Sequence, residues 1–437
     1  MKIVHTADLH IGQTLYNDYD RTEEHRHFFG QLEKLCIREK PHALVVSGDV
    51  FDSQQPGATV KKFFADTFVH LQRSCPEMKI VIAAGNHDSA SRLSADSSIW
   101  DLAGARVVGV SPAAGVSTDI KGDAAKLSWQ DNYIVRLDGT GYIIVLPYMA
   151  GGERKDMIQS LLDRVESENE AGLPVVMTGH LAVAGMDPTG HEGDIGKIRV
   201  QSTASLGKGY DYLALGHIHK PQTIGHPQDC LNPDVTYPSG VIRYSGSALH
   251  VSCDEKYPHT ISIVEMERHG GDVRIRQERI SELLHFYELP LDGSSFTSEK
   301  EALEGLEDFA EGHPDGGYFR FRLDYRTALP SDFNNKVYAI TGARGERHRF
   351  NPKHIWTGAP SGGASKKKKR VFEVAELQQM TDPVIFIEKT KDKYPDLDIS
   401  VLREAFEEVE QEVRRMAEEE KKNYKKQVNK INGSLTL

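Results

Sequence analysis

The feature that most restricts the fold of this chain is a series of short apolar runs in residues 1–282. Segments with helix-like patterns separate the runs, which read KIVHTAD, ALVVSGD, KIVIAAGNHD, YIIVLPY, VVMTGH and YLALGHIH. Strands that alternate with helices along a sequence are typical of α/β domains, because parallel strands need long crossover connections. We therefore predict an α/β domain over this region.

The rest of the chain divides into three shorter regions. Residues 283–357 contain a strand-like YFRFRLDYR and a helix-like SDFNNKVYAI, which predict a small α+β domain. Residues 358–370 are rich in Gly, Ser and Lys and end in KKKKR, which predicts a flexible basic linker. The lysines at 366–369 either bind DNA or only keep the linker soluble. Residues 371–437 are predicted to be helical, with an apolar face formed by Ile399, Leu402, Phe406, Val409 and Val413.

The composition limits the class of protein. A net charge of −11 gives no general attraction to nucleic acid, so a polyanion would need local basic patches or metal ions. The four cysteines are widely scattered and form no C-x-x-C pair, which argues against a disulfide framework or a thiolate zinc site. No apolar run approaches the ~18 residues of a membrane helix, and the chain opens on a strand without a leader pattern. We therefore predict a cytoplasmic location.

Residue types that bind metals stand at the ends of five predicted strands. The last of these, LGHIH, places two histidines at i and i+2, so both can point to one side of an extended segment. The set is Asp8, His10, Asp49, Asn86, His87, Asp88, His180, His217 and His219. Carboxylates and imidazoles bind divalent metals, and α/β sheets place ligands at the carboxyl ends of their strands. A single such histidine is usually a core residue, but five strand ends together predict a metal site.

A second H-x-H pair, His25 and His27, lies in a helix-like segment. Residues i and i+2 do not share a face of a helix, so these two side chains cannot converge on one site. We predict that both histidines are exposed to solvent and have no function.

The motifs D-x-H, G-D-x-x-D, G-N-H-D, G-H and G-H-x-H, in this order, resemble those of the calcineurin-like metallophosphoesterase superfamily. Within it, HTADLHIGQ, SGDVFDS, GNHDS and LGHIHKPQ are most similar to the SbcD family of nucleases, the bacterial counterparts of the eukaryotic double-strand-break repair nuclease. The resemblance implies a two-sheet α/β metallophosphoesterase sandwich over residues 1–282. It also implies an α+β capping domain over 283–357 and a C-terminal helical segment, 371–437, that binds an ATPase.

The resemblance also implies a role for each site residue. One metal would be held by Asp8, His10 and His219, the other by Asn86, His180 and His217, and Asp49 would bridge both. The implied cofactors are two divalent ions, with Mn²⁺ expected, although Fe, Zn and Mg suit the same ligand types. His87 would be the catalytic histidine, with Asp52 as its hydrogen-bonding carboxylate; a structural cap is the alternative for Asp52. Gln13, Tyr16 and Arg92 are candidates for DNA contact or ordinary surface residues.

The function implied is a DNA nuclease, with 3′–5′ double-strand exonuclease and single-strand endonuclease activities. Its implied partners are DNA ends, hairpins and single strands, an SbcC-type SMC-like ATPase, and a second copy of the chain within a heterotetramer at the nucleoid. A phosphatase of the same superfamily is the alternative. Protein phosphatases resemble G-D-x-V-D-R-G and G-N-H-E, and here Ser53 and Asp88 replace that Arg and Glu. An inactive DNA-end scaffold would have lost ligands, yet all seven are present.

Overall fold

The computed structural model describes residues 1–358, apart from residues 17–18, 96, 103, 110–128, 149–154, 190–199, 227–231 and 344–346. The predicted helical segment and the predicted linker after residue 358 lie outside the described residues. The chain divides into two compact units, residues 1–360 and 361–437, and the elements below belong to the first. Within the described part of the chain, no helix combines the length and the apolar character needed to cross a membrane.

The larger of the two main sheets has seven strands, in the order β14-β17-β16-β1-β4-β5-β6. Strands β1, β4, β5 and β6 run parallel to one another, and β16, β17 and β14 extend the sheet as antiparallel strands. Because β1, β4 and β5 are parallel neighbours, their carboxyl ends lie at the same edge of the sheet. The bounds are β1 Lys2–Thr6, β4 Ala43–Ser47, β5 Lys79–Ala83, β6 Ala105–Val108, β14 Asp234–Tyr237, β16 Thr260–Met266 and β17 Val273–Arg279.

The second main sheet has six strands, in the order β13-β15-β12-β9-β8-β7. Its four inner strands are parallel, and β7 and β13 are antiparallel strands at its two edges. All six apolar runs of the sequence form strands of one sheet or the other, namely β1, β4, β5, β8, β9 and β12. The bounds are β7 Ile134–Leu137, β8 Gly141–Leu146, β9 Val175–His180, β12 Tyr212–Gly216, β13 Gln222–Thr223 and β15 Val241–Tyr244.

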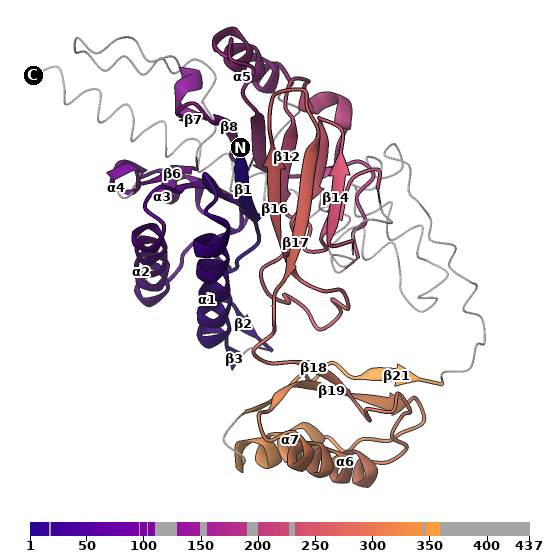
Figure 1. The fold of residues 1–437 in the computed structure, drawn as a ribbon. Coiled ribbons are helices and arrows are strands. Elements are labelled where there is room, and N and C mark those ends of the chain that lie inside the picture. The colour runs from indigo at the N-terminus through magenta and orange to yellow at the C-terminus, as the bar shows by residue number, and fades with distance from the viewer. Residues whose placement is uncertain are drawn as a thin grey trace, which may run out of the picture. The chain divides into compact units, whose positions relative to one another are not determined.

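The two sheets pack face to face around one apolar core (Figure 1). Val45 of the first sheet and Leu213 of the second belong to this core, whereas Leu44 points to the opposite face of β4 and packs with helices α1 and α2. Strands buried on both faces have continuous rather than alternating apolar patterns, which explains the runs in the sequence. The predicted two-sheet α/β sandwich is confirmed. The covering helices are α1 Thr22–Glu39, α2 Ala58–Ser74 and, against β8, α5 Lys155–Glu168.

Several short elements connect these layers. Strand β2 pairs with β3, and β10 pairs with β11, each as a separate two-stranded sheet. Their bounds are β2 Thr14–Leu15, β3 Tyr19–Asp20, β10 Ala182–Val183 and β11 Val200–Gln201. The short helices are α3 Ala90–Ala95, α4 Ser97–Leu102, η1 Trp129–Asn132 and η2 Thr203–Leu206.

Residues 286–357, called the capping region below, form a sheet with a core of their own. Strand β19 lies between β18 and β20 and also pairs with β21, always in parallel, and α6 and α7 lie together beside the sheet (Figure 1). The sequence predicted β19 and α7 but not α6, although S-x-x-E at 298–301 is a helix-start signal. The bounds are β18 Phe286–Leu289, α6 Glu299–Gly312, β19 Gly317–Asp324, α7 Phe333–Ala343, β20 His348–Phe350 and β21 Ile355–Thr357.

The prediction for His25 is wrong, because its side chain is buried in α1 with 1% exposure. Its Nε2 lies 2.8 Å from the Leu9 carbonyl oxygen, and its Nδ1 lies 3.0 Å from the carbonyl oxygen of Arg21. His27 lies on a different face of α1 and is half-buried, with its Nε2 3.2 Å from Ser281 Oγ. Which face of a helix packs inward depends on neighbours that the local sequence does not specify. His25 therefore supports the loop after β1.

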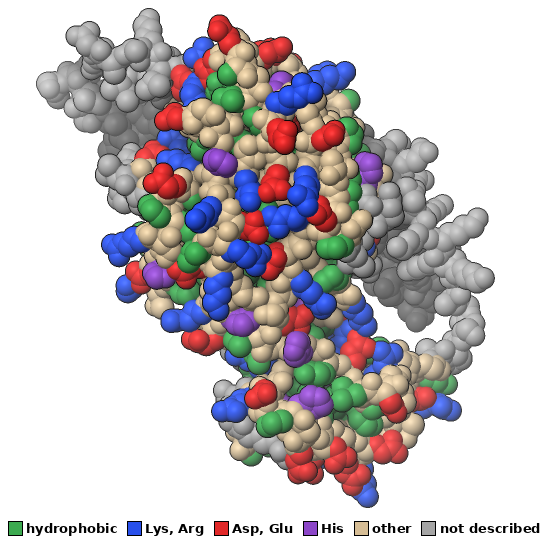
Figure 2. All heavy atoms as spheres, in the orientation of Figure 1, with side chains coloured by type: hydrophobic (Ala, Val, Ile, Leu, Met, Phe, Trp, Pro, Cys, Tyr) green, Lys and Arg blue, Asp and Glu red, His purple; other side chains and the backbone are tan. Residues whose placement is uncertain are grey.

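The face of the sandwich over β14, β16 and β17 carries basic and acidic side chains interspersed with one another (Figure 2). Arg276 Nη2 lies 2.6 Å from Glu39 Oε2, and Arg274 Nη2 lies 2.5 Å from Asp234 Oδ2. Because these arginines are already paired with carboxylates, they do not form a basic patch suited to a polyanion.

Candidate metal centre

The five strand ends predicted to carry ligands meet at one place. Asp8 and His10 follow β1, Asp49 follows β4, Asn86 and His87 follow β5, His180 ends β9, and His217 and His219 follow β12. The first sheet thus supplies the carboxylates and the amide, and the second sheet supplies three of the imidazoles. Ligand atoms within 4.8 Å of one another form three groups: Asp8, His10 and His219; Asp8, Asp49 and His180; His10, Asp52 and His87.

The first group, Asp8, His10 and His219, is the trio predicted for one metal. All three side chains are buried, and the rings of His10 and His219 lie 5.3 Å apart in an edge-to-face arrangement. Asp52 Oδ1 lies 3.3 Å from His10 Nδ1, but among the described residues neither ring nitrogen of His10 has a hydrogen-bond partner of good geometry. A buried imidazole is costly to leave unsatisfied, whereas a divalent cation would satisfy it. The donor set therefore fits a metal ion.

The second group surrounds Asp49 and His180, which are buried against each other. His180 Nε2 lies 3.2 Å from Asp49 Oδ2 and 3.0 Å from Asn86 Oδ1. The ring of His217, the remaining predicted ligand, packs edge-on against the ring of His180 at 5.1 Å. On the other side, His10 Nε2 lies 4.0 Å from the same Asp49 oxygen. One Asp49 oxygen thus lies near a histidine of each group, as a bridging ligand would, and Asp8 also belongs to both groups.

Backbone amides hold the two central carboxylates in place. The His217 amide donates to Asp8 Oδ1 at 2.9 Å, and the His87 amide donates to Asp49 Oδ1 at 2.8 Å. Asp8, His10, Asp49 and His217 all have positive φ, between 46° and 90°. Such a conformation costs ~1–3 kcal/mol for each non-glycine residue and occurs mostly at functional sites. The fold therefore holds these four residues in an unfavourable backbone conformation.

Glycine at position 85 leaves room for Asp49. A Cβ atom on Gly85 would lie 2.1 Å from Asp49 Oδ1, far inside contact distance. Any larger residue would displace the carboxylate that faces both ligand groups. The glycine is therefore required by close approach, since its φ is not in the left-handed region.

The charges in the site favour a cation. Burial alone would raise the pKa of Asp49, but the neighbouring His180 and His10 hold this pKa below its usual range. Burial alone would lower the pKa of His180, yet Asp49 raises it. Burial lowers the pKa of His219 well below its usual range, so this ring stays neutral, which is the form that binds metals. The carboxylates thus stabilise positive charge at the point where a divalent ion would lie.

The predicted hydrogen bond between Asp52 and His87 is present, but its acceptor differs from the prediction. His87 Nδ1 lies 2.8 Å from the backbone carbonyl oxygen of Asp52. The Asp52 carboxylate instead faces His10, with 3.3 Å between Oδ1 and Nδ1. The prediction that the carboxylate orients His87 is therefore wrong, because the chain after β4 turns its carbonyl towards this ring. His87 itself is exposed beside the buried ligands.

The candidates for DNA contact differ in exposure. Gln13 is buried, with 7% exposure, and accepts a hydrogen bond from Arg21 Nη1 at 2.7 Å, which argues against the predicted DNA contact. Tyr16 is half-buried and packs edge-on against Tyr318 of the capping region, with ring centres 5.9 Å apart. Arg92 is exposed and donates to the Gln54 carbonyl oxygen at 3.1 Å, so only this candidate stays on the surface.

Two acidic residues have roles that the sequence did not indicate. Asp88 is a backbone acceptor, since its carboxylate accepts from the amides of Gly85, Val50 and Phe51 at 2.8 to 3.1 Å. Glu255 lies on a loop before β16, and its Oε1 is 2.8 Å from His219 Nδ1. The G-N-H-D motif contains Asp88 but does not distinguish a ligand from a backbone acceptor. No periodicity or motif marks Glu255.

Residues 1–221 match the model of the calcineurin-like phosphoesterase family, and the chain belongs to this family. It is therefore a hydrolase of phosphate esters, and its family implies divalent metal ions. The chain is similar to several bacterial proteins that are named as the SbcD component of the nuclease SbcCD. The protein from Rhodobacter capsulatus is 27% identical over 68% of this chain and 73% of its own length. Those from Escherichia coli K12 and Bacillus subtilis are 27% and 28% identical, over 60% and 61% of this chain.

The matches to the Escherichia coli K12 and Bacillus subtilis proteins span 65% and 66% of the lengths of those proteins, just under two thirds. Among solved structures, a dimetal phosphatase from Danio rerio matches 64% of this chain and 99% of its own at 13% identity. Its TM-score of 0.33 is too low to add to the assignment.

Proposed function

We propose that this chain is a metal-dependent DNA nuclease that hydrolyses phosphodiester bonds. The observation that carries the proposal is the Asp49 carboxylate, whose Oδ2 faces His180 on one side and His10 on the other. Two ligand groups that share one carboxylate suit two neighbouring cations. The proposed ligands are Asp8, His10 and His219 for one ion, Asn86, His180 and His217 for the other, and Asp49 for both. We propose Mn²⁺ as the metal.

Each group of the site has a separate task in this proposal. When bound, two divalent ions would activate water and stabilise negative charge on the phosphate. The chain orients its own carboxylates for this through the amides of His87 and His217. A carbonyl oxygen can only accept, so His87 Nδ1 carries the hydrogen that faces Asp52. This leaves Nε2 of His87 as the nitrogen that can take up a proton from solvent and then transfer it to the leaving oxygen.

Similarity to the SbcD nuclease proteins supports DNA as the substrate over a phosphorylated protein. We propose that the chain acts on DNA ends, hairpins and single strands, as a 3′–5′ exonuclease on double strands and as an endonuclease on single strands. We further propose an SbcC-type ATPase as partner, held by residues 371–437, and a dimer of this chain within a heterotetramer near the nucleoid. A phosphatase that acts on a substrate other than DNA is the competing function.

An assay on end-labelled DNA tests the proposal. The full-length protein is incubated with duplex, hairpin and single-stranded DNA in Mn²⁺ or Mg²⁺, with and without the ATPase. We expect cleavage that requires metal and that chelation abolishes. Hydrolysis of phosphomonoesters without cleavage of any DNA would favour the phosphatase instead. The polarity follows from whether the label at the 3′ or the 5′ end is released first.

A further inference from the structure

Glu255 is a buried carboxylate that contacts a proposed metal ligand without being one itself. It is 3% exposed and lies on the loop of residues 250–259, which leads into β16. Its Oε1 is 2.8 Å from His219 Nδ1, and its Oε2 accepts from the Val251 amide at 2.9 Å. The second contact fixes the carboxylate relative to its own loop. The first fixes it relative to the imidazole.

A carboxylate in this position determines how an imidazole can bind a metal. An ionised carboxylate only accepts hydrogen bonds, so Glu255 selects the form of His219 that carries hydrogen on Nδ1. The lone pair of the neutral ring is then on Nε2, the nitrogen left to face Asp8 and His10 in the first ligand group. Such partners orient the ring and increase its basicity, and their loss typically costs ~10–100-fold in metal affinity.

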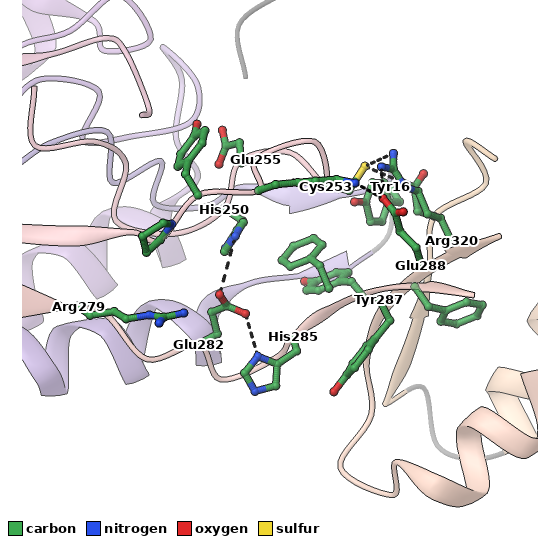
Figure 3. A pocket seen from close by; sticks show the side chains of 17 residues that line it. Tyr16, His250, Cys253, Glu255, Arg279, Glu282, His285, Tyr287, Glu288 and Arg320 are labelled. Atoms are coloured by element: carbon green, nitrogen blue, oxygen red, sulfur yellow. Dashed lines mark hydrogen bonds and ion pairs between the residues drawn. The ribbon is translucent and has the colours of Figure 1, made fainter. Parts of the chain in front are cut away.

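The two residues that precede Glu255 are held by the capping region. The Cys253 sulfur accepts from Arg320 Nη1 at 3.1 Å and from Asn351 Nδ2 at 3.0 Å. Arg320 also pairs with Asp254 at 2.9 Å. These contacts reach the loop from β19 and from the segment that follows β20 (Figure 3). The loop therefore connects the capping region directly to the histidine of the metal centre.

A cavity of about 420 Å³ separates part of the loop from the capping region. Its wall includes Glu255 and Glu282 on one side and Glu288 and Arg320 on the other (Figure 3). Lys256 Nζ reaches across to Glu288 Oε1 at 2.7 Å. Residues 253, 254 and 256 of the loop are thus joined to the capping region by polar contacts, while the His250 ring packs against Phe286, so a shift of the capping region would act on the loop through these contacts.

We propose that Glu255 is a positioning residue for His219, and that the contacts of the capping region with residues 253 and 254 maintain this position. The placement of the capping region would then determine the metal affinity of the Asp8, His10 and His219 group. This inference rests on the proposed metal site and adds a residue and a means of regulation to it.

The first test measures metal binding and histidine structure in full-length Glu255→Gln and Glu255→Ala proteins. Calorimetry with Mn²⁺ alone should resolve two binding steps in the parent protein. We expect one step to weaken by ~10–100-fold in Glu255→Ala and less in Glu255→Gln, which keeps an acceptor oxygen and the shape. In ¹⁵N-histidine NMR of the metal-free protein, His219 should change from a single Nδ1–H form to a mixture in Glu255→Ala. Glu282→Gln is the control, because Glu282 lies in the wall of the same cavity. It should leave both the Mn²⁺ affinity and the His219 signal unchanged.

The second test concerns the capping region. Arg320→Ala removes the contacts with Cys253 and Asp254, together with the pairing of Arg320 and Glu288, while residue 255 itself remains Glu. We expect it to weaken the same Mn²⁺ step several-fold, and we expect no further loss when it is combined with Glu255→Ala, because both act through one residue. Arg326→Ala is the control, since Arg326 pairs with Asp324 inside the capping region.

The outcomes separate this inference from the proposed function. Unchanged Mn²⁺ binding and unchanged His219 signals in both folded Glu255 variants would overturn the positioning role. Effects of Arg320→Ala and Glu255→Ala that simply add would overturn the link to the capping region. A parent protein that binds no Mn²⁺ would overturn the metal-dependent function itself, whatever the variants do.

Discussion

His87 is oriented by the backbone of Asp52, with 2.8 Å between Nδ1 and the carbonyl oxygen. Because this contact uses the backbone of Asp52, no substitution of the Asp52 side chain removes it directly. The carboxylate of Asp52 lies 3.3 Å from His10 instead. Orientation of the proposed catalytic histidine and support of the proposed ligand therefore depend on different parts of one residue.

Replacement of His87 by Ala should remove proton transfer without removing metal. Because His87 is exposed and is not among the seven proposed ligands, we expect Mn²⁺ content and DNA binding to stay near those of the parent protein. Turnover should fall by ~10²–10⁴-fold, the usual contribution of general acid–base catalysis. Metal analysis, a gel-shift assay and single-turnover cleavage measure the three quantities. Loss of metal, or nearly normal turnover, would contradict the role assigned to His87.

Replacement of Asp52 by Asn should affect His10 more than His87. The carbonyl of residue 52 remains, so the signal of His87 in ¹⁵N-histidine NMR should be unchanged. The carboxylate that raises the pKa of His10, against the effect of burial, is lost, and this pKa should fall. We expect a change in the pH dependence of Mn²⁺ affinity together with turnover well above that of His87→Ala. Equal loss of turnover in the two variants would instead restore the carboxylate as the partner of His87.

Replacement of Asp49 or His217 by Ala should abolish activity and lower metal occupancy. Asp49 faces both ligand groups, so its loss should lower the content of both ions, whereas the loss of His217 should lower only one. The decrease in affinity should exceed the ~10–100-fold that residues behind the ligands contribute. Elemental analysis after dialysis measures the content. Full occupancy in both variants would show that the ligands have been assigned incorrectly.

Acid should weaken the ion pairs between the sandwich and the capping region. Burial alone would raise the pKa of Glu288, but Lys256 and Arg320 lower it to about 2, from an ordinary value of 4.5. A carboxyl group with a lowered pKa stabilises the fold above its unfolded pKa, and this contribution is lost as pH falls through the folded pKa. Denaturant unfolding should therefore show a decline between about pH 4.5 and 2 that is smaller in Glu288→Gln. Parallel pH profiles for the two proteins would contradict this.

Deletion of residues 371–437 should separate catalysis from assembly. We expect the shortened chain to hydrolyse a small phosphodiester such as bis(p-nitrophenyl) phosphate at the parent rate, because the proposed ligands all precede residue 220. It should no longer co-purify with the ATPase. Unchanged co-purification would favour the alternative in which the apolar face of this segment packs against the chain's own core.

The strands and the ligand positions could be predicted because chain geometry fixes both. A buried strand such as β4 is a continuous apolar run, and Asp49 follows it at a distance set by the turn. The positions of Gln13, His25 and the Asp52 carboxylate could not be predicted in this way. Each depends on which distant group approaches it: Arg21 for Gln13, the Leu9 carbonyl for His25 and His10 for Asp52. Glu255 is a further example, since it lies 36 positions along the chain from His219 and no motif marks it.

The division of the ligands between two sheets also affects how the protein acquires its activity. Asp8, His10, Asp49 and Asn86 come from the first sheet, and His180, His217 and His219 come from the second. A chain in which only the first sheet has formed holds no imidazole from β9 or β12 in place and cannot complete either ligand group. Metal capture can therefore occur only after the two sheets have packed, and bound metal then stabilises the packed state by mass action. Chains in which the two sheets have not packed should consequently be unable to cleave phosphate esters.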